Sequence, residues 1–164
     1  MSTLERHHRF ALAIRLIGHH TKLSIVHAAT AVRLETLRRL YREIHERPPR
    51  GGPLANSVGT VAKTRGQQAH ASLFARLYLA RQGPVLDQAI DYLALTDAYD
   101  LYLALLPGGS RPLLPINLAW AVASDLRSGQ ASFSRCPRCD VQYLLMHTGS
   151  LGLRCPICAL YVRA

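Results

Sequence analysis

Residues 136–158, CPRCDVQYLLMHTGSLGLRCPIC, contain all the cysteines of this 164-residue chain. The cysteines form two CxxC pairs, Cys136 with Cys139 and Cys155 with Cys158, separated by fifteen residues. Each pair turns the backbone so that two thiolates point to one ion. A hairpin between the pairs would bring the four sulfurs into the tetrahedral arrangement that zinc prefers. Because four cysteines leave no open position for water, we expect one structural Zn²⁺ ion per chain.

Three other chemistries use cysteine pairs. Two disulfides need an oxidising compartment, whereas Glu5, His7 and His8 lie where a secretory signal peptide has its apolar region. A redox-active CxxC pair normally belongs to a βαβ scaffold, and no such pattern surrounds these pairs. An iron–sulfur cluster takes the same four thiolates and stays an alternative. His147 is a substitute ligand to consider, although its position in mid-segment favours exposure.

The period of the sequence changes after Gln130, where short apolar pieces stand at Phe133, at Val141 and Tyr143 to Met146, and at Leu151 and Leu153. Short apolar pieces and a turn at residues 148–150 predict small β-hairpins, so residues 131–164 are expected to form a zinc-binding, zinc-ribbon-like module. Helical periodicity dominates the chain before about Gly129. We therefore expect a mainly α protein, with a helical body over residues 1–130 and a small C-terminal module built on the four cysteines.

The first fifty residues suggest a helix-turn-helix. A helix of about four turns ends near Gly18, and its expected apolar face consists of Leu4, Ala11, Ile14 and Ile17. The candidate helix-turn-helix covers residues 23–46. Its second helix repeats apolar residues at spacings of three and four, namely Leu34, Leu37, Leu40, Tyr41 and Ile44. No glycine occupies the turn, so the motif is weaker than the cysteine pattern.

Proline and glycine divide the rest of the helical body. Residues 47–63 contain Arg47-Pro-Pro-Arg-Gly-Gly-Pro53 and predict a linker. A helical bundle is expected over residues 64–129, from helices at 64–82, 85–106 and 115–128. Each of these helices is followed by a glycine or by a glycine and proline pair. The bundle carries many leucines, which favours contact with a partner protein.

The charge favours a polyanionic partner. The formal net charge is +10, and residues 1–50, 51–130 and 131–164 contribute +6, +1 and +3. The two ends of the chain are basic and its middle is nearly neutral, so the ends are expected to contact the phosphate backbone of a nucleic acid. The candidate DNA-binding residues are Arg38, Arg39 and Arg42 on the second helix of the helix-turn-helix and Arg135, Arg138 and Arg154 around the cysteine pairs. The alternative is a solvated face in which Glu35 pairs with the neighbouring arginines.

No enzyme signature is present in the sequence. It lacks the nucleophile elbow, the P-loop, the Rossmann glycines and HExxH. Four helical acids, Asp87, Asp91, Asp97 and Asp100, could be imagined as a metal set, but Asp87 and Asp91 fit a solvated stripe. No apolar run is long enough to span a membrane. We therefore expect a non-enzymatic protein without a membrane partner, located in the cytoplasm.

Several stretches, taken in order, resemble the FlhC family, the C subunit of the bacterial flagellar master transcriptional regulator. They are Leu23, Thr30, Leu37-Arg-Arg-Leu-Tyr-Arg-Glu43, Pro48-Pro-Arg-Gly51, His70-Ala-Ser-Leu-Phe74, Ala119-Trp120, Ser128-Gly129 and the two cysteine pairs. Only the cysteine set is specific by itself. The resemblance lies in the order and separation of the stretches from about Leu23 to Cys158.

The resemblance implies a DNA-binding transcriptional activator subunit that acts with FlhD at flagellar class II promoters. It implies a hetero-oligomer with an FlhD-like subunit, a heterohexamer of four FlhD and two FlhC chains, together with promoter DNA and RNA polymerase as partners. It also implies that the four cysteines hold zinc. The alternative function is a non-catalytic zinc-containing scaffold, or an RNA-binding or interaction protein whose arginines bind RNA or an acidic protein.

Overall fold

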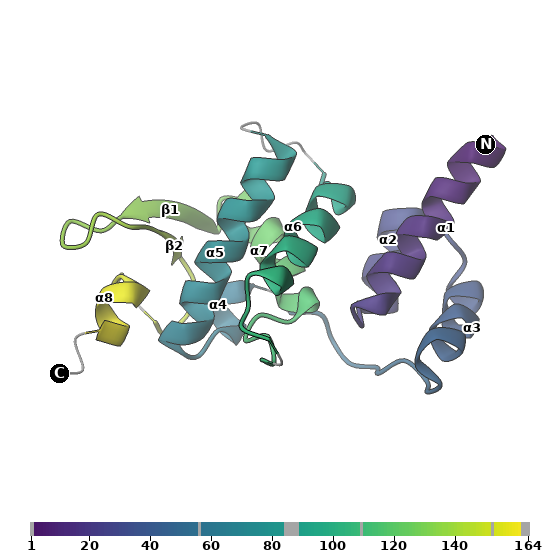
Figure 1. The fold of residues 1–164 in the computed structure, drawn as a ribbon, viewed down its shortest axis with the longest axis horizontal. Helices are drawn as coiled ribbons and strands as arrows, with labels where there is room; N and C mark the ends of the chain where they lie inside the picture. Colours follow the sequence, from purple (N-terminus) through teal and green to yellow (C-terminus); the bar gives the residue numbers. More distant parts are fainter. Residues whose placement is uncertain (1, 56, 84–88, 109, 152, 162–164) are drawn as a thin grey trace. The chain divides into compact units, whose positions relative to one another are not determined.

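The computed structural model describes residues 2–55, 57–83, 89–108, 110–151 and 153–161. The chain divides into two compact units, Met1–Leu54 and Ala55–Ala164. Within the described residues, the regular elements of the first unit are all helices, and the second unit combines helices with one two-stranded sheet (Figure 1). The expectation of a mainly α fold is confirmed.

Three helices form the first unit: α1 (Thr3–Gly18), α2 (Leu23–Thr30) and α3 (Leu34–His45). Each of them packs against the other two. Their shared core is small and apolar, and its largest members are Leu16, Ile17, Ile25, Leu37 and Tyr41. Burial of these side chains stabilises the unit by about 1.5–3 kcal/mol for each.

The turn between α2 and α3 is three residues long, a length that is common in helix-turn-helix motifs. Ala31 adopts the left-handed conformation, with φ 54°, that a glycine would commonly supply. The ring nitrogen Nδ1 of His27 lies 2.8 Å from the Val32 carbonyl oxygen, and the Thr30 hydroxyl accepts from the Val32 N–H at 3.3 Å. These two contacts fix the turn without a glycine.

The predicted apolar face of α1 is wrong in three of its four positions. Leu4 and Ile14 are 64% and 49% exposed, and Ala11 is exposed as well, whereas Ala13, Leu16 and Ile17 are buried. Periodicity alone did not show the direction from which α2 and α3 approach. That direction selects the row of residues 13, 16 and 17.

Helix α5 (Arg65–Gln82) is central in the second unit and packs against α6 (Tyr92–Ala104), α7 (Ile116–Arg127), the strand β2 (Gln142–Met146) and the helix α8 (Pro156–Tyr161). A capping box defines its start, since the Thr64 hydroxyl accepts from the Gln67 N–H and the Gln67 side chain accepts from the Thr64 N–H. The core of the unit includes the buried side chains of Phe74, Tyr78, Leu95, Tyr102, Leu114 and Ile116.

One predicted helix and one predicted linker differ from the structure. The helix expected over 85–106 is α6, which begins at Tyr92 because the Asp91 carboxylate accepts from the N–H groups of Leu93 and Ala94 at 2.9 Å. The expected first residues, 85–88, lie outside the described residues. The segment expected as a linker over 47–63 contains the short helix α4 (Val58–Val61), which packs against α7.

Strands β1 (Ala131–Arg135) and β2 (Gln142–Met146) pair in antiparallel register, with Phe133 opposite Leu144. The other side of β2 faces α5. There the Ser72 hydroxyl accepts from the Leu144 N–H at 2.9 Å, and the buried Gln68 amide donates to the Leu144 carbonyl at 3.2 Å. Two polar side chains of one helix therefore satisfy the edge of the sheet where it would otherwise be buried without partners.

The hairpin predicted between the two cysteine pairs is wrong in its position. The first pair, Cys136 and Cys139, lies in the turn that joins β1 to β2. The second pair lies at the start of α8 (Pro156–Tyr161), where short apolar pieces led us to expect another hairpin. Pro156 is the first residue of this helix, a position that tolerates the missing N–H of proline.

Candidate metal centre and basic surfaces

The first cysteine pair is shaped by the hairpin turn. The Cys136 N–H donates to the Val141 carbonyl at 3.0 Å, and the Asp140 N–H donates to the Cys136 carbonyl at 2.9 Å. Asp140 has a left-handed φ of 60°, which closes the turn. This geometry brings the side chains of Cys136 and Cys139 to the same side of the loop.

The second pair is shaped by helix α8 and held against the first. The Ala159 N–H donates to the Cys155 carbonyl at 3.1 Å. The Tyr143 hydroxyl, on β2, donates to the Leu153 carbonyl at 2.7 Å and so ties the segment before the second pair to the sheet. Tyr143 also forms a small buried cluster with Cys136 and Cys155.

The four sulfurs gather within 4.8 Å of one another. The Sγ atoms of Cys136 and Cys158 are 3.7 Å apart, and so are those of Cys139 and Cys155. A disulfide has sulfurs only about 2.05 Å apart, so both contacts join free thiols. An ion bound at about 2.3 Å from each of four tetrahedral sulfurs separates them by about 3.8 Å. The cluster therefore has the dimensions of a four-thiolate metal centre.

The thiols differ in acidity because their surroundings differ. The backbone N–H groups of Cys139 and Arg138 stabilise the Cys136 thiolate and lower its pKa to about 6. Hydrogen bonding of the Cys158 thiol with the Cys139 sulfur, followed by burial, raises the pKa of Cys158 to about 12, and burial raises the pKa of Cys155. Four thiolates at such close range need a cation to be ionised together.

A hollow of about 520 Å³ opens beside the sulfurs. Its charged lining consists of Arg65, Arg138 and Arg154, with no acidic side chain. Of the three arginines predicted around the cysteine pairs, the structure thus brings Arg138 and Arg154 together. Arg135 is exposed, pairs with Asp140 and does not line the hollow.

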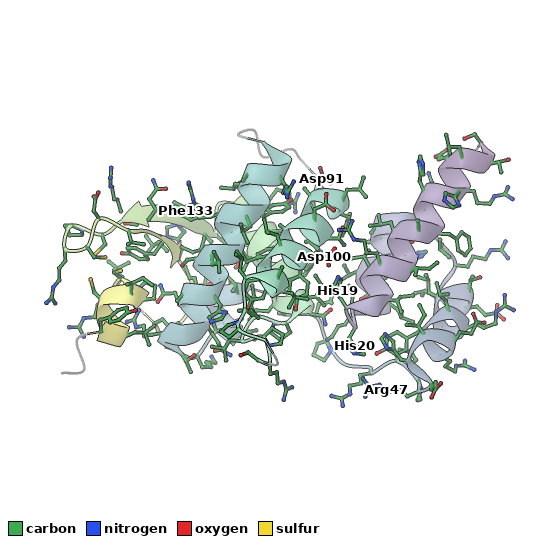
Figure 2. All side chains as sticks on the ribbon, in the orientation of Figure 1. His19, His20, Arg47, Asp91, Asp100 and Phe133 are labelled. Carbon is green, nitrogen blue, oxygen red and sulfur yellow. The ribbon has the colours of Figure 1, made fainter. Side chains whose placement is uncertain are left out.

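Sequence reasoning missed Arg65. Its guanidinium donates to the Arg154 carbonyl at 2.9 Å and to the Gln68 side chain at 2.8 Å, so it joins the first turn of α5 to the segment before Cys155. No local sequence signal marks this residue, because it lies 89 positions from Arg154. Arg76, also on α5, lies over the ring of Phe133 at 5.6 Å (Figure 2 labels Phe133 on β1).

The arginines predicted on the second helix of the helix-turn-helix, Arg38, Arg39 and Arg42, are all exposed on α3. Arg39 and Arg42 line a hollow of about 390 Å³ with Glu35 and Thr36, and Arg38 does not. Arg39 pairs with Glu43 at 3.8 Å, with side chains 78% and 64% exposed. An exposed pair of this kind contributes under about 1 kcal/mol, so the guanidinium can exchange Glu43 for another anion.

The other metal candidates are separate from the cysteine cluster. His147 is exposed and its Nε2 lies 3.0 Å from the Ser132 hydroxyl. Asp91 and Asp100 lie at the start and farther along α6 (Figure 2), and Asp87 is outside the described residues. Among the residues that the structure describes, the four cysteines are the one group of three or more such ligands close enough to share an ion.

Two histidines have altered acidity. Burial lowers the pKa of His70, whose Nδ1 lies 2.7 Å from the Tyr102 hydroxyl. Burial, followed by the charge of His45, lowers the pKa of His20, whose ring stacks on that of His45 with centroids 4.0 Å apart. His20 follows the end of α1 (Figure 2). Both arrangements favour the neutral ring.

The family model and the individual relatives that match this chain both carry the name FlhC. The model of the FlhC family, described as flagellar transcriptional activator, matches residues 1–164. The chain is 31% identical over 152 residues to the flagellar transcriptional regulator FlhC of Serratia marcescens, which covers 90% of this chain and 76% of the relative. It is 29% identical over 159 residues to the flagellar transcriptional regulator FlhC of Verminephrobacter eiseniae, and this match covers 96% of this chain and 84% of the relative. In the described part of the chain, no helix combines the length and the hydropathy needed to cross a membrane.

Proposed function

The chain belongs to the FlhC family of flagellar transcriptional activators, and on that basis we propose that it is a DNA-binding subunit that activates transcription at flagellar class II promoters together with an FlhD-like subunit. It acts as a regulator and not as an enzyme, and its place of action is the cytoplasm. The observation that carries the proposal is the helix-turn-helix of the first unit, whose second helix exposes Arg39 and Arg42 around one hollow.

The chemistry of the exposed arginines fits duplex DNA. A guanidinium donates two hydrogen bonds in a plane, which matches both a phosphate and the O6 and N7 edge of guanine. We assign this role to Arg39 and Arg42, with Arg38 on the flank of the same helix. The major groove is wide enough for an α-helix, so α3 can lie in it with its arginine face toward the base edges.

We propose Arg138 and Arg154 as a second basic contact, with Arg135 at its edge. Both arginines line the hollow beside the cysteine sulfurs, and they are adjacent in sequence to two of the four cysteines, Cys139 and Cys155. The proposed cofactor is one Zn²⁺ per chain, bound by Cys136, Cys139, Cys155 and Cys158. The ion stabilises the loops from which these arginines project, so its role is structural.

The proposed partners are an FlhD-like subunit, promoter DNA and RNA polymerase, in a heterohexamer of four FlhD and two FlhC chains. Exposed leucines of the second unit support a protein partner, since Leu93, Leu105 and Leu113 are 59%, 56% and 47% exposed. Large apolar side chains left in water favour contact with another protein. We expect the thermal midpoint of the chain to rise when the FlhD-like subunit is added.

The test is promoter binding by the complex of this chain with its FlhD-like subunit at fixed salt. We expect replacement of Arg39 and Arg42 by alanine to cost about 1–3 kcal/mol per base contact and to reduce the preference for promoter over shuffled duplex. The matched control replaces Arg81 and Arg111, two exposed arginines of the second unit, by alanine. An unchanged preference in the Arg39 and Arg42 variant would contradict the proposal.

The alternative is a zinc-containing scaffold or RNA-binding protein, and the same assay separates it. If single-stranded RNA competes better than promoter duplex at equal salt, the arginines serve RNA. Salt dependence alone does not discriminate, because all polyanion binding shows it.

A further inference from the structure

A second hollow in the first unit is lined by three arginines that sequence patterns did not indicate. It has a volume of about 430 Å³ and lies where the first half of α1 passes the turn between α2 and α3. Its lining consists of Arg6, Arg9, Phe10, Thr30, Ala31, Val32, Arg33 and Thr36. Every lining residue belongs to Met1–Leu54, so the hollow is a feature of that unit alone.

Two of these arginines, Arg6 and Arg9, lie on α1 in line with the residues that pack against the other helices. The row of α1 that packs on its neighbours contains Ala13, Leu16 and Ile17, all buried. Continued toward the N-terminus at spacings of three and four, the same row contains Phe10, Arg9 and Arg6. The arginines thus continue the row that packs inward farther along the helix, and here Arg6 is exposed and Arg9 is half-buried.

This part of the row stays open because α1 is longer than its partner. Helix α1 has 16 residues and α2 has 8, which gives lengths of about 24 Å and 12 Å. The first two turns of α1 therefore extend past the end of α2, over residues 31–33. An apolar row would be expected there if another element of this unit covered it, whereas guanidinium groups suit an anionic ligand.

The charges around the hollow leave two guanidinium groups available. Arg9 pairs with Glu5 at 2.7 Å. Arg6 and Arg33 form no ion pair with any residue that the structure describes. Helix α3 starts at the hollow without a side-chain cap, so its first N–H groups add positive potential there.

The hollow adjoins the surface already assigned to DNA. Thr36 lines both this hollow and the one that contains Arg39 and Arg42. The two hollows therefore meet at the start of α3, with arginines in the lining of both and Glu35 in the lining of one. A helix-turn-helix that inserts its second helix in the major groove brings the preceding turn and the first helix near the flanking backbone.

We propose that Arg6 and Arg33 bind backbone phosphates of duplex DNA beside the bases that α3 contacts, with the Thr36 hydroxyl between the two sites. This inference rests on the proposed function and adds to it a separate, sequence-independent contact. Phosphate contacts fix the register of the protein on the duplex, whereas contacts to base edges give the preference for one sequence.

The experiment measures duplex binding by the complex with the FlhD-like subunit as a function of salt concentration. The test variant is Arg6→Gln with Arg33→Gln, and the matched control is Arg81→Gln with Arg111→Gln. Each lost phosphate contact should lower the slope of log affinity against log salt by about 0.9. For each copy of this chain that contacts the duplex, the test variant should therefore lose about 1.8 in slope and about 10- to 100-fold in affinity at about 0.1 M salt. Promoter and shuffled duplexes should be affected equally.

A charge-retaining variant and three other outcomes distinguish the possible roles of Arg6 and Arg33. Arg6→Lys with Arg33→Lys should restore most of the slope, and circular dichroism should show an unchanged fold. A test variant with the slope and affinity of the wild type overturns this inference while leaving the proposed function intact. A variant that binds DNA normally but loses RNA polymerase overturns it in favour of an acidic protein segment. A wild-type complex that binds no duplex overturns the proposed function itself.

Discussion

The Asp125 carboxylate on α7 accepts a hydrogen bond from the Ser57 hydroxyl at 2.7 Å, across 68 positions of sequence. The same carboxylate oxygen accepts from the Val58 N–H at 2.7 Å, and the Ser57 hydroxyl also lies 2.7 Å from that of Thr148. Asp125 is only 3% exposed. One buried acid therefore links α7, the start of α4 and the loop that leads from β2 to the second cysteine pair.

Replacing Asp125 by alanine should lower the free energy of unfolding by about 2–4 kcal/mol, because the Ser57 hydroxyl and the Val58 N–H lose a charged partner in a buried site. Urea denaturation of the full chain measures this. Glu43→Ala is the control, since it removes an exposed carboxylate that pairs with Arg39 and should cost under about 1 kcal/mol. Equal losses in the two variants would contradict the assigned role of Asp125.

Glycine at position 59 should be required for the same junction. A Cβ there would overlap the backbone carbonyl of Thr148, which cannot move away as a flexible side chain could. We expect Gly59→Ala to destabilise the chain by about 1–3 kcal/mol, the usual cost of overpacking. Thermal unfolding gives the comparison with Gly18→Ala, where a Cβ meets nothing within 4 Å and helix propensity favours alanine. Equal thermal midpoints for Gly59→Ala and Gly18→Ala would contradict this expectation.

Metal removal should unfold the end of the second unit. Purified chain should contain one zinc by elemental analysis, and a chelator should abolish hydrogen-exchange protection in β1, β2 and α8, because the ion joins the two cysteine turns that hold these elements, and β1 and α8 bury few large apolar side chains. Protection in α5 should fall in part, since Gln68 and Ser72 bond to Leu144. Helices α1–α3 should keep their protection.

A variant controls for nonspecific effects of the chelator. His147→Ala should retain the metal and the protection, because its side chain is outside the sulfur cluster. Cys158→Ser should reproduce the effect of the chelator. Full protection of β2 after zinc has been removed would show that packing on α5 suffices without the ion.

Acidification should destabilise the second unit through His70. Its pKa in the folded chain lies below the ordinary 6.5, so the unfolded chain binds the proton more readily. The stabilisation is complete above pH 6.5 and declines as the pH falls toward the lower, folded pKa. Because one proton is involved, the unfolding free energy changes by at most about 1.4 kcal/mol per pH unit.

The measurement is the difference in unfolding free energy between about pH 7.5 and about pH 5.5, on either side of the ordinary histidine pKa, compared for the wild type and His70→Gln. The variant should show the smaller dependence on pH. His8→Gln, at an exposed site near the start of α1, is the control and should leave the dependence unchanged. A His70 variant with the pH dependence of the wild type would show that the native fold does not disfavour the protonated ring.

Local sequence signals determined much of this protein. Glycine and proline marked the ends of α5 and α7, and the CxxC spacing identified the four residues whose sulfurs gather. The amphipathic pattern of α3 identified the side that contains Arg39 and Arg42. These features follow from the sequence because caps, turns and helical spacing act over a few residues, where neighbours along the chain are also neighbours in space.

Only the tertiary structure decided which surfaces meet. It selected the row of Ala13, Leu16 and Ile17 on α1, and it placed the first cysteine pair in the turn of a hairpin. It brought Arg65 to Arg154 and Ser57 to Asp125. A helix with apolar side chains on several sides does not by itself specify which side is covered. That choice depends on the free energy of packing against elements remote in sequence, as does the overhang of α1 that leaves Arg6 beside Arg33.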